Sequence, residues 1–433
     1  MLARSTTARG NEARTSKEEE KELETKMIQT NFYDAIVIGA RCAGSPTAML
    51  LARQGYRVLL LEKATFPSEV PRGHMIQALG VALLKEWGLF EQVLASNCPP
   101  ISRLVFDLGP FALVGMPEGA TLIAPRRGIL DKILADAATA SGVERREGFL
   151  VQEILMDGDR VTGIRGHGPD GVQVTEHAKI VIGADGLYSL VAQTVQAPTY
   201  YVKPPLTCSY FTYYYDLPVE ETAVYVRGNR LIVVFPTNDE TTCIGIQFPR
   251  EDLTLFRTDI AGNFLNVVGL VPELAMRVRN AIQADRFLGV TNIPNFFRKP
   301  YGPGWALVGD AGYHKDPYTG QGIADAFFSA KLLAEAIDAG LSGRQPLEEA
   351  LADYERQRNE EVLPRYEFCY QLATFEPPSP EMQQLFGALL SNQAETNNFF
   401  GTITGTVPIP EFFAPANLQR IISQNGVLLS ASE

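Results

Sequence analysis

The first clear pattern of apolar and polar residues lies near the N-terminus. A short apolar run at residues 33–38 is followed by a helical spacing of small and apolar residues, Pro46 to Arg53, and then by a second apolar run at 57–61. Apolar runs of this length bounded by turn residues are typical of buried strands, whereas the period of the middle segment is that of a helix. The pattern predicts a strand, a helix and a second strand within about thirty residues, which is a βαβ unit.

The turn of this unit carries glycines at the spacing that a dinucleotide requires. The first strand runs into Gly39-Ala40-Arg41-Cys42-Ala43-Gly44, and Glu62 ends the second strand 23 positions after Gly39. The glycines let the backbone approach a pyrophosphate, and the acidic residue accepts hydrogen bonds from a ribose. Glu62 disfavours a 2′-phosphate, so the unit favours NAD or FAD over NADP. The alternative is an ordinary βαβ unit with glycines in its turn.

Arg41 occupies the middle position of this motif, where glycine is usual. A side chain there limits how closely the backbone can approach the pyrophosphate. Its guanidinium can instead pair with a phosphate oxygen, which would partly offset that loss. We therefore keep Arg41 in the candidate cofactor site.

A second glycine motif follows a predicted β-meander. Strands are expected at 149–155, 161–165, 172–175 and 178–181, with Asp, Pro and Gly at the turns between the first three. The last strand leads into Gly183-Ala184-Asp185-Gly186. The carboxyl ends of parallel strands meet at one edge of a sheet, so Asp185 is expected to face the same crevice as the Gly39 turn.

The third motif lies near the three-quarter point of the chain. An apolar run at 305–308 precedes Gly309-Asp310-Ala311-Gly312-Tyr313-His314-Lys315-Asp316-Pro317-Tyr318-Thr319-Gly320-Gln321-Gly322, and a helical apolar spacing begins at Ile323. This order predicts a strand, a ligand-facing loop and a helix. The unpaired N–H groups and the positive dipole end at the start of the helix favour a partly negative ligand atom beside Gly320 and Gly322.

Four charged residues are further candidates. Arg72 lies in a loop after the second strand, where it either faces a ligand or is solvated. Arg127 opens a helix, a position where the helix dipole favours acids, so a ligand contact explains it better than helix stability. Lys315 and Asp316 are the polar groups expected nearest the reacting centre, and the alternative for both is a solvated ion pair.

Aromatic-rich segments predict a second sheet. Residues 208–215, 223–226, 231–235 and 242–248 are rich in β-branched and aromatic residues and are predicted to be antiparallel strands. Phe211, Tyr213 and Tyr215 share one face of the first segment by the strand period of two, and Phe235 joins the same candidate set. These side chains either form core and cross-strand pairs or line a pocket for an apolar or aromatic substrate.

Composition and charge narrow the classes of function. The chain has 433 residues, enough for two or three domains, and a net charge of −12, which disfavours a nucleic-acid groove. Five scattered cysteines and four histidines show no ligand spacing, so we expect no metal site and a reducing, cytoplasmic setting. No window has the roughly 18 to 20 apolar residues of a bilayer span, so no stable membrane insertion is expected. The charge-rich residues 1–30 predict a disordered extension.

The three glycine motifs and the Arg127 helix stand in a fixed order, and together they resemble the p-hydroxybenzoate-hydroxylase-like FAD oxidoreductases. This group includes group A flavoprotein monooxygenases, flavin-dependent halogenases and geranylgeranyl-reductase-like enzymes, and the resemblance covers roughly residues 32 to 340. It implies FAD as the cofactor and NADH or NADPH as a transient reductant. The cofactor-binding residues that it implies are Gly39, Ala40, Arg41, Gly44, Glu62, Lys63, Arg72, Arg127, Asp185, Gly186, Gly309, Asp310, Pro317, Gly320, Gln321 and Gly322.

The resemblance also implies roles along the cofactor. Gly39 and Glu62 would hold the ADP half, and Asp310 would hydrogen-bond the ribityl chain. Pro317 would lie beside the isoalloxazine, and the N–H groups from Gly320 onward would face its pyrimidine edge. Because the reduced ring is anionic there, a helix N-terminus is a suitable neighbour.

The implied fold is α/β: a Rossmann-like, three-layer FAD-binding domain of the GR2 type, an inserted antiparallel-sheet substrate domain and a helical C-terminal region. The expected FAD-binding domain is discontinuous, at residues 31–100, 125–200 and 290–342. The substrate sheet is expected at 101–124 and 201–289, and the mostly helical region at 343–433 is expected to cap the pocket or pack on its substrate side.

The implied activity is that of a monooxygenase, which uses NAD(P)H and O2 through a C4a-hydroperoxyflavin to hydroxylate or epoxidise an apolar or aromatic small molecule. One alternative is a geranylgeranyl-reductase-like flavin reductase or a dehydrogenase. A halogenase is less favoured because Trp87 and Trp305 are the only tryptophans and the WxWxIP stretch is absent. A non-catalytic flavin-binding protein is the last alternative, and a homodimer is compatible with the sequence.

Overall fold

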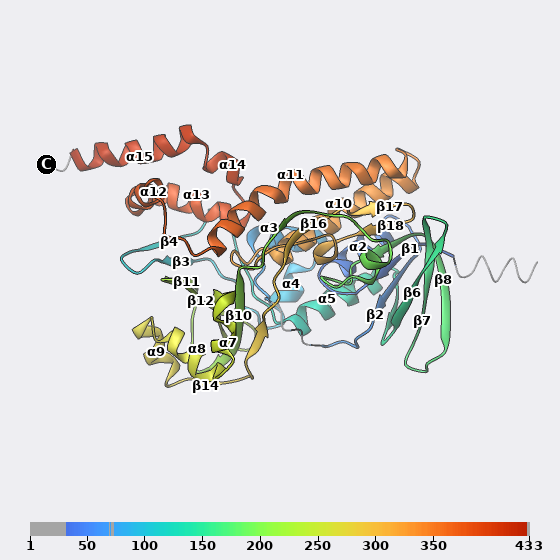
Figure 1. The fold of residues 1–433 in the computed structure, drawn as a ribbon, viewed down its shortest axis with the longest axis horizontal. Helices are drawn as coiled ribbons and strands as arrows, with labels where there is room; N and C mark the ends of the chain where they lie inside the picture. The colour runs from blue at the N-terminus through green and yellow to red at the C-terminus, as the bar shows by residue number, and fades with distance from the viewer. Residues whose placement is uncertain (1–31, 69, 71–72, 431–433) are drawn as a thin grey trace, which may run out of the picture.

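The computed structural model describes residues 32–68, 70 and 73–430. The charged extension expected at residues 1–30 lies outside these ranges. The described chain has a mixed α/β fold with two large sheets and a group of C-terminal helices (Figure 1), which confirms the predicted fold class. Within the described residues, no helix is long and apolar enough to cross a membrane.

The first sheet is built around parallel strands whose two faces are both buried. Its order is β17 (Tyr301–Gly302), β18 (Trp305–Leu307), β8 (Gln173–Gly183), β1 (Phe32–Ile38), β2 (Val58–Glu62) and β5 (Glu144–Glu147), with β6 (Leu150–Asp157) and β7 (Arg160–His167) continuing from β8 as an antiparallel hairpin. Burial on both faces explains why β1 and β2 are unbroken apolar runs.

The prediction of two separate strands at 172–175 and 178–181 is wrong. Residues 173–175 and 178–181 both belong to the single strand β8 (Gln173–Gly183), and Val172 precedes it. Residues 173–177 pair with β7, whereas residues from His177 onward pair in parallel with β1. The polar residues in the middle of β8 therefore mark a change of partner strand, not a break in the strand.

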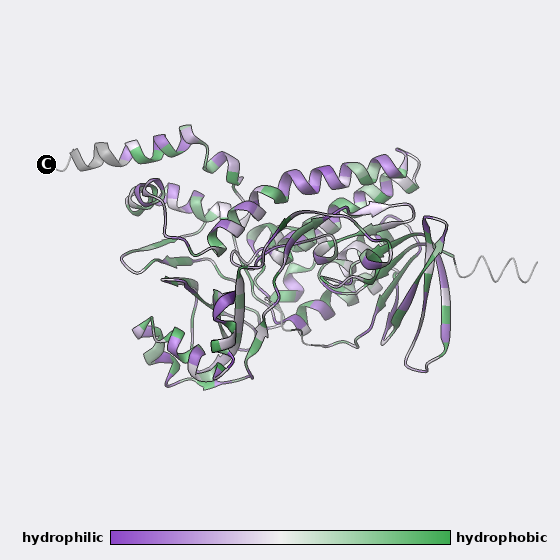
Figure 2. Cartoon of the chain, in the orientation of Figure 1, coloured by the Kyte–Doolittle hydropathy of each residue, from purple (hydrophilic) through white to green (hydrophobic). Residues whose placement is uncertain are grey.

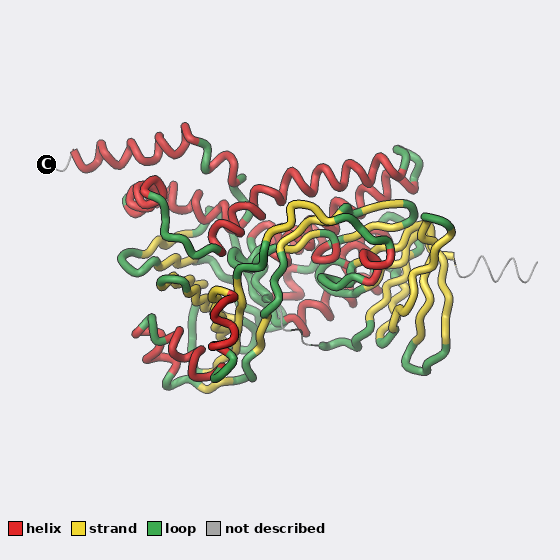
Figure 3. The backbone as a smooth tube through the Cα atoms, in the orientation of Figure 1, coloured by secondary structure: helices red, strands yellow, loops and turns green. Residues whose placement is uncertain are grey.

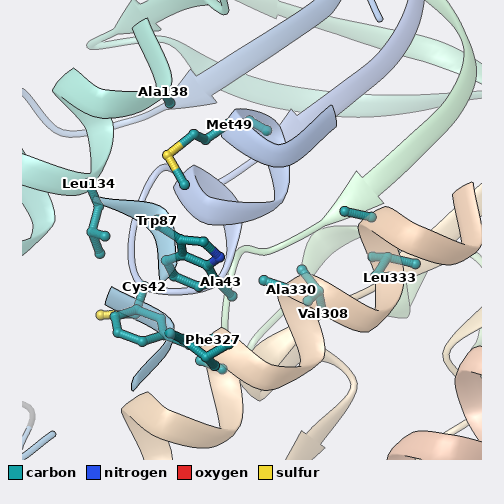
Figure 4. Close-up of a cluster of buried hydrophobic side chains, with 14 of the residues drawn as sticks. Cys42, Ala43, Met49, Trp87, Leu134, Ala138, Val308, Phe327, Ala330 and Leu333 are labelled. Atoms are coloured by element: carbon teal, nitrogen blue, oxygen red, sulfur yellow. The ribbon is translucent and has the colours of Figure 1, made fainter. Parts of the chain in front are cut away.

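Helices cover one face of the first sheet. They are α2 (Gly44–Arg53), α3 (Ala78–Trp87), α5 (Arg127–Ala140) and α10 (Gly322–Leu341). Met49 of α2, Trp87 of α3 and Phe327 of α10 meet in one buried cluster, with the Trp87 and Phe327 rings 5.2 Å apart (Figure 4). The β6–β7 hairpin packs on the other face through Val161 and Ile164, so the predicted three layers are present.

The second sheet collects strands from distant parts of the sequence. Its order is β14 (Ile282–Gln283), β10 (Thr207–Tyr215), β13 (Thr242–Pro249), β12 (Arg230–Pro236), β11 (Thr222–Arg227), β3 (Leu104–Asp107) and β4 (Ala112–Gly115), with β15 (Leu288–Val290) also on β10. Helices α7 (Leu253–Phe256), α8 (Ile260–Val268) and α9 (Pro272–Val278) cover one face. Tyr210 and Tyr214 of β10 point to that face, and Phe211 and Tyr213 point to the other, as the period of two predicts.

The C-terminal region is helical almost throughout. After α11 (Leu347–Ala373) come α12 (Pro380–Leu390), α13 (Gln393–Thr404), α14 (Ile409–Phe412) and α15 (Pro415–Ser430), visible as the red coils beyond the long α11 in Figure 3. The hydropathy colouring of α11 includes long polar stretches (Figure 2). Phe386, Phe399 and Phe400 pack toward the second sheet.

Helices continue directly after the proline-rich stretch at residues 377–380. The side chains of Ser379 and Asn392 cap α12 and α13, accepting hydrogen bonds from the N–H groups of Met382 at 3.3 Å and Glu395 at 3.2 Å. Ser379 and Asn392 are poor residues for a helix interior, and here each begins a helix as its N-cap.

Candidate active site

One large cavity joins the three glycine motifs to the second sheet and the C-terminal helices. Its volume is about 2030 Å³. Ligand pockets commonly have about 300–1,000 Å³, so this cavity has room for a dinucleotide and a further molecule. Its wall is largely apolar along β11, β12 and α12–α14, and more polar at the glycine motifs.

The Gly39 turn and the Gly183-Ala184-Asp185-Gly186 turn lie against each other at the carboxyl ends of β1 and β8. Gly39 has φ of +101°, and a Cβ on it would lie 2.4 Å from the carbonyl oxygen of Ala184. A Cβ on Gly44 would lie only 1.8 Å from the carbonyl oxygen of Gly39. Both glycines are therefore required by the backbone, and the bare turn leaves space that a pyrophosphate can occupy.

Glu62 is buried behind the first turn. Its Oε2 accepts the N–H of Ala40 at 2.9 Å and its Oε1 accepts the N–H of Ala64 at 3.1 Å. Glu62 and its neighbour Lys63 both contribute to the cavity wall. The carboxylate thus fixes the turn and still borders the space where a ribose would lie.

Arg41 and Arg127 share one carboxylate. Arg41 Nη1 lies 2.7 Å from Asp131 Oδ2, and Arg127 donates from Nε and Nη2 to Asp131 at 3.0–3.1 Å. Asp131 is fully buried one helical turn after Arg127. The ion pair with Asp131 therefore accounts for an arginine at the start of α5 without a ligand, whereas the sequence favoured a ligand contact over helix stability as the explanation.

The same two arginines still border the cavity. Arg127 is attracted electrostatically to Asp310, which belongs to the short turn η2 (Gly309–Ala311). Burial raises the pKa of the Cys42 thiol, whose Sγ lies 3.4 Å from Asp131 Oδ1. Arg127 therefore places a cation near Asp310 of the third motif, and Arg41 places another in the cavity wall at the first motif.

Asp185 offers an acceptor to the cavity. Its Oδ2 accepts the N–H of Leu190 at 2.6 Å, whereas its Oδ1 is buried without a hydrogen-bond partner. Burial raises the pKa of this carboxyl. A hydroxyl donor from a bound ligand would satisfy Oδ1, so this residue fits a cofactor that carries ribose or ribityl hydroxyls.

The third motif folds as predicted, from β18 through η2 and β19 (Tyr313–His314) into α10. Gly309 and Gly320 have φ of +60° and +64°. A Cβ on Gly309 would lie 2.7 Å from the Cβ of Ala43 in the first motif. The third motif therefore closes directly onto the first, and Asp310, Pro317 and Gly322 all border the cavity.

Lys315 and Asp316 are buried, and they are not paired with each other. Lys315 Nζ lies 2.7 Å from Asp325 Oδ2 and donates to Gln321 Oε1 at 2.9 Å. Asp325 also accepts from Arg365 at 2.9 Å and from the Tyr313 hydroxyl at 2.6 Å. The alternative of a solvated loop ion pair is therefore wrong.

Asp316 ties the third motif to the second sheet. Its carboxylate accepts the Thr207 hydroxyl of β10 and the Gln247 amide of β13, both at 2.5 Å, and the N–H of Tyr318 at 3.1 Å. Burial raises the pKa of this carboxyl. Lys315 and Asp316 border the cavity, but their side chains are bound to other residues of the protein. Their main effect is therefore to fix the position of the third-motif loop.

The aromatic substrate candidates separate into two groups. Phe211 and Phe235 border the cavity, together with His74, whose ring lies 5.2 Å from the Phe235 ring. Tyr213 is buried behind them and stacks on His74 at 5.5 Å. Tyr215 is 47% exposed at the end of β10 and lies outside the cavity wall, so it leaves the candidate set.

Several of the predicted cofactor residues do not themselves border the cavity. Ala40 contributes its N–H to Glu62, Gly44 allows the close turn, and Gln321 donates to the Ile403 carbonyl at 2.8 Å. Arg72 lies outside the described residues.

Sequence reasoning missed part of the wall. The C-terminal aromatic residues that border the cavity include Phe368, Phe386, Phe399, Phe400 and Phe413. These residues carry no motif, and the dense phenylalanine content of residues 399–413 was the available signal. Gln77, just before α3, is a second residue that the motifs did not indicate.

Comparison with known proteins agrees with this geometry. The site is that of an FAD-dependent oxidoreductase of the group A flavoprotein superfamily, and the protein is an enzyme. Residues 33–253 match the family described as FAD binding domain, and the chain belongs to that family. The resemblance stated from the sequence is confirmed.

Relatives with different activities share the fold. The chain is 27% identical over 334 residues to digeranylgeranylglycerophospholipid reductase 2 of Methanopyrus kandleri, covering 71% of this chain and 78% of that one. A flavoprotein/dehydrogenase from Cytophaga hutchinsonii superposes with a TM-score of 0.76 at 20% identity, covering 93% of this chain and 100% of that chain. PqsL of P. aeruginosa in complex with 2-aminobenzoylacetate gives 0.69 at 22% identity, covering 79% and 96%. At these identities the structural likenesses establish the fold alone.

Proposed function

We propose that one FAD binds along the three glycine motifs. The ADP half lies at Gly39 and Glu62, with Arg41 toward the pyrophosphate and the Asp185 turn beside the sugar hydroxyls. Asp310 holds the ribityl chain, and Pro317 and the start of α10 border the ring. Three observations support this fit: the close turn at Gly39, the unpartnered buried Asp185 Oδ1, and the attraction between Arg127 and Asp310.

The proposed division into units follows the two sheets. The FAD-binding part comprises residues 31–100, 125–200 and 290–342, and the substrate part comprises 101–124 and 201–289. Pairing of β3 with β11 supports assigning residues 101–124 to the second sheet. The cavity lies where these parts and the C-terminal helices meet.

The proposed reaction is oxygenation of an apolar or aromatic small molecule, with NADH or NADPH as reductant and O2 as co-substrate. A bound FAD supplies the electron transfer and the activation of oxygen. The observation that carries this proposal is the apolar wall beyond the third motif, formed by one face of the second sheet and by the phenylalanines of α12 and α13. Such a wall excludes water from the reacting edge and binds an apolar substrate there.

Few polar side chains of the described residues lie near the apolar wall, and those beside the third motif are held by ion pairs and hydrogen bonds. Lys315 and Asp316 fix the loop that carries Pro317, as their buried contacts require. His74 is an ionisable side chain among the aromatic residues of the substrate wall; its ring stacks on Tyr213 and meets Phe235 edge-to-face. A substrate hydroxyl placed beside Phe211 and Phe235 would find His74 as its hydrogen-bonding neighbour.

A reductase of carbon–carbon double bonds is the second candidate. The relative from Methanopyrus kandleri is named as a reductase of a digeranylgeranyl lipid. The apolar wall also follows β12 from Leu231 to Phe235, a distance of about 13 Å at the strand's rise per residue. An elongated apolar chain would fit along such a wall.

One experiment distinguishes the oxygenase from the reductase of carbon–carbon double bonds. The purified protein is reduced without oxygen by NADH or NADPH in the presence of a panel of apolar and aromatic ligands, and is then exposed to ¹⁸O2. Oxygenation predicts ligand-stimulated reduction followed by a product that carries one ¹⁸O atom. A reduced product formed before oxygen is admitted would instead support the reductase and overturn the oxygenase proposal.

A further inference from the structure

Gln77 holds its side-chain amide in one orientation at the edge of the cavity. Its Nε2 donates to the carbonyl oxygen of Thr319 at 3.0 Å. The reverse orientation would place two acceptor oxygens against each other, so the Nε2 atom must face Thr319. Gln77 is 5% exposed, and a Cβ on Gly320 would lie 3.3 Å from its Nε2, so the amide packs directly on the third motif.

The other end of this amide is an acceptor without a donor. Gln77 Oε1 is buried and has no hydrogen-bond partner, and Gln77 borders the cavity. Buried carbonyl oxygens are almost always hydrogen-bonded, so an orphan acceptor beside a ligand cavity points to a donor on the ligand. Of the other orphan acceptors that border the cavity, Asp185 Oδ1 belongs to the second glycine motif and Thr222 Oγ1 to the second sheet.

Backbone hydrogen-bond donors at the start of α10 lie in the same part of the cavity wall as Gln77. Gln77 is the N-cap residue of α3 and Gln321 that of α10, so both helices begin beside it. The two helices cross closely, since a Cβ on Gly80 would lie 3.2 Å from the Cα of Ala324. The first N–H groups of α10 precede its first intrahelical hydrogen bond, from Asp325 to Gln321, and Gly322 and Ile323 border the cavity, so they remain available to a ligand.

A side-chain acceptor beside backbone donors has a definite complement. The pyrimidine edge of an isoalloxazine presents a carbonyl, the N3–H group and a second carbonyl in one plane. We propose that Gln77 Oε1 accepts the hydrogen bond of the flavin N3–H group, while the N–H groups at the start of α10 bind a flanking carbonyl. This inference rests on the FAD site proposed above and adds a side-chain hydrogen bond to the isoalloxazine ring.

The contact also affects the redox balance of the cofactor. The N3–H group is more acidic in the oxidised ring than in the reduced ring, so an acceptor there favours the oxidised form. Hydrogen bonds to ring nitrogens are one of the means by which a protein tunes a flavin. Gln77→Leu should therefore raise the midpoint potential of the bound flavin.

The test compares FAD with 3-deaza-FAD, in which carbon replaces N3 and the N–H donor is lost. Affinities are measured by flavin fluorescence on apoprotein, with no turnover required. The intact protein should bind FAD roughly tenfold more tightly than 3-deaza-FAD, the range of one buried hydrogen bond. Gln77→Leu should reduce this ratio to near one.

Gln321→Leu is the matched control. It removes a neighbouring amide whose Oε1 and Nε2 are used by Lys315 and Ile403, so it loosens the same loop without removing the N3 acceptor. Gln321→Leu should weaken the binding of both FAD and 3-deaza-FAD and keep the tenfold ratio between their affinities. If Gln77→Leu keeps that ratio, or if the intact protein shows none, the Gln77 contact is refuted while the FAD site stands. If neither cofactor binds the intact protein, the FAD site itself is refuted.

Discussion

The Nζ atom of Lys315 lies 2.7 Å from Oδ2 of Asp325, and both side chains are buried. Asp325 also neutralises Arg365, so one carboxylate serves two buried cations. Asp325→Asn leaves both cations without this charge and should destabilise the protein by about 3–5 kcal/mol. Denaturant unfolding measures the loss, and Glu360→Gln, which breaks an exposed pair with Arg356, should cost less than about 1 kcal/mol. Equal losses in the two variants would contradict the buried network.

Asp316 should make the stability of the protein depend on pH. Burial raises its pKa above the usual 3.8, so the folded protein holds this proton more tightly than the unfolded chain. The carboxyl's contribution to stability is fully present below the unfolded value and is lost as pH rises through the folded pKa. Wild type should therefore gain stability relative to Asp316→Asn as pH falls from 7 to 4, measured by denaturant unfolding at each pH. A relative loss over that range would show that the hydrogen bonds from Thr207 and Gln247 outweigh burial.

Gly39→Ala should abolish cofactor binding. The added Cβ would lie 2.4 Å from a backbone oxygen of Ala184, which cannot move aside without opening β1 from β8. Gly55→Ala is the control, because Gly55 has φ of +91° but open space around its Cβ position. It should cost about 1–2 kcal/mol of backbone strain and leave FAD affinity intact. FAD binding by Gly39→Ala at the wild-type affinity would refute the close-turn argument.

Arg41 should contribute to FAD affinity through a phosphate. Arg41→Gly leaves Asp131 still paired with Arg127, so the fold around α5 should persist. The variant should bind FAD roughly tenfold more weakly, as the loss of a charge-assisted hydrogen bond implies. Arg41→Lys should recover part of the affinity, because it keeps the charge and loses the bidentate geometry. Unchanged or tighter binding by Arg41→Gly would show that the residue serves Asp131 alone.

Much of the FAD-binding fold could be predicted because its signals are local. Gly39, Glu62 and Asp185 each stand at the carboxyl end of a buried strand, and strand ends can be read from apolar runs. The break assigned within β8 shows the limit of that reasoning. Its polar residues reflect a change of neighbour from β7 to β1, which only the sheet topology reveals.

The missed features depend on contacts between distant segments. The sequence does not show that Asp131 pairs with Arg41, 90 positions away. Nor does it show that Gln77 hydrogen-bonds to Thr319, 242 positions away. The phenylalanines of α12 and α13 carry no motif, and they become part of the site only by packing on the second sheet. Local patterns therefore identified the cofactor class, whereas the substrate wall required the tertiary structure.

The most direct test of the FAD site is a titration of the apoprotein with FAD, followed by mass analysis of the flavin released on denaturation. We predict saturation at one FAD per chain, a yellow protein, and loss of that binding in Gly39→Ala but not in Gly55→Ala. A protein that takes up no FAD, or that binds it equally well after Gly39→Ala, would contradict a cofactor held along the three glycine motifs.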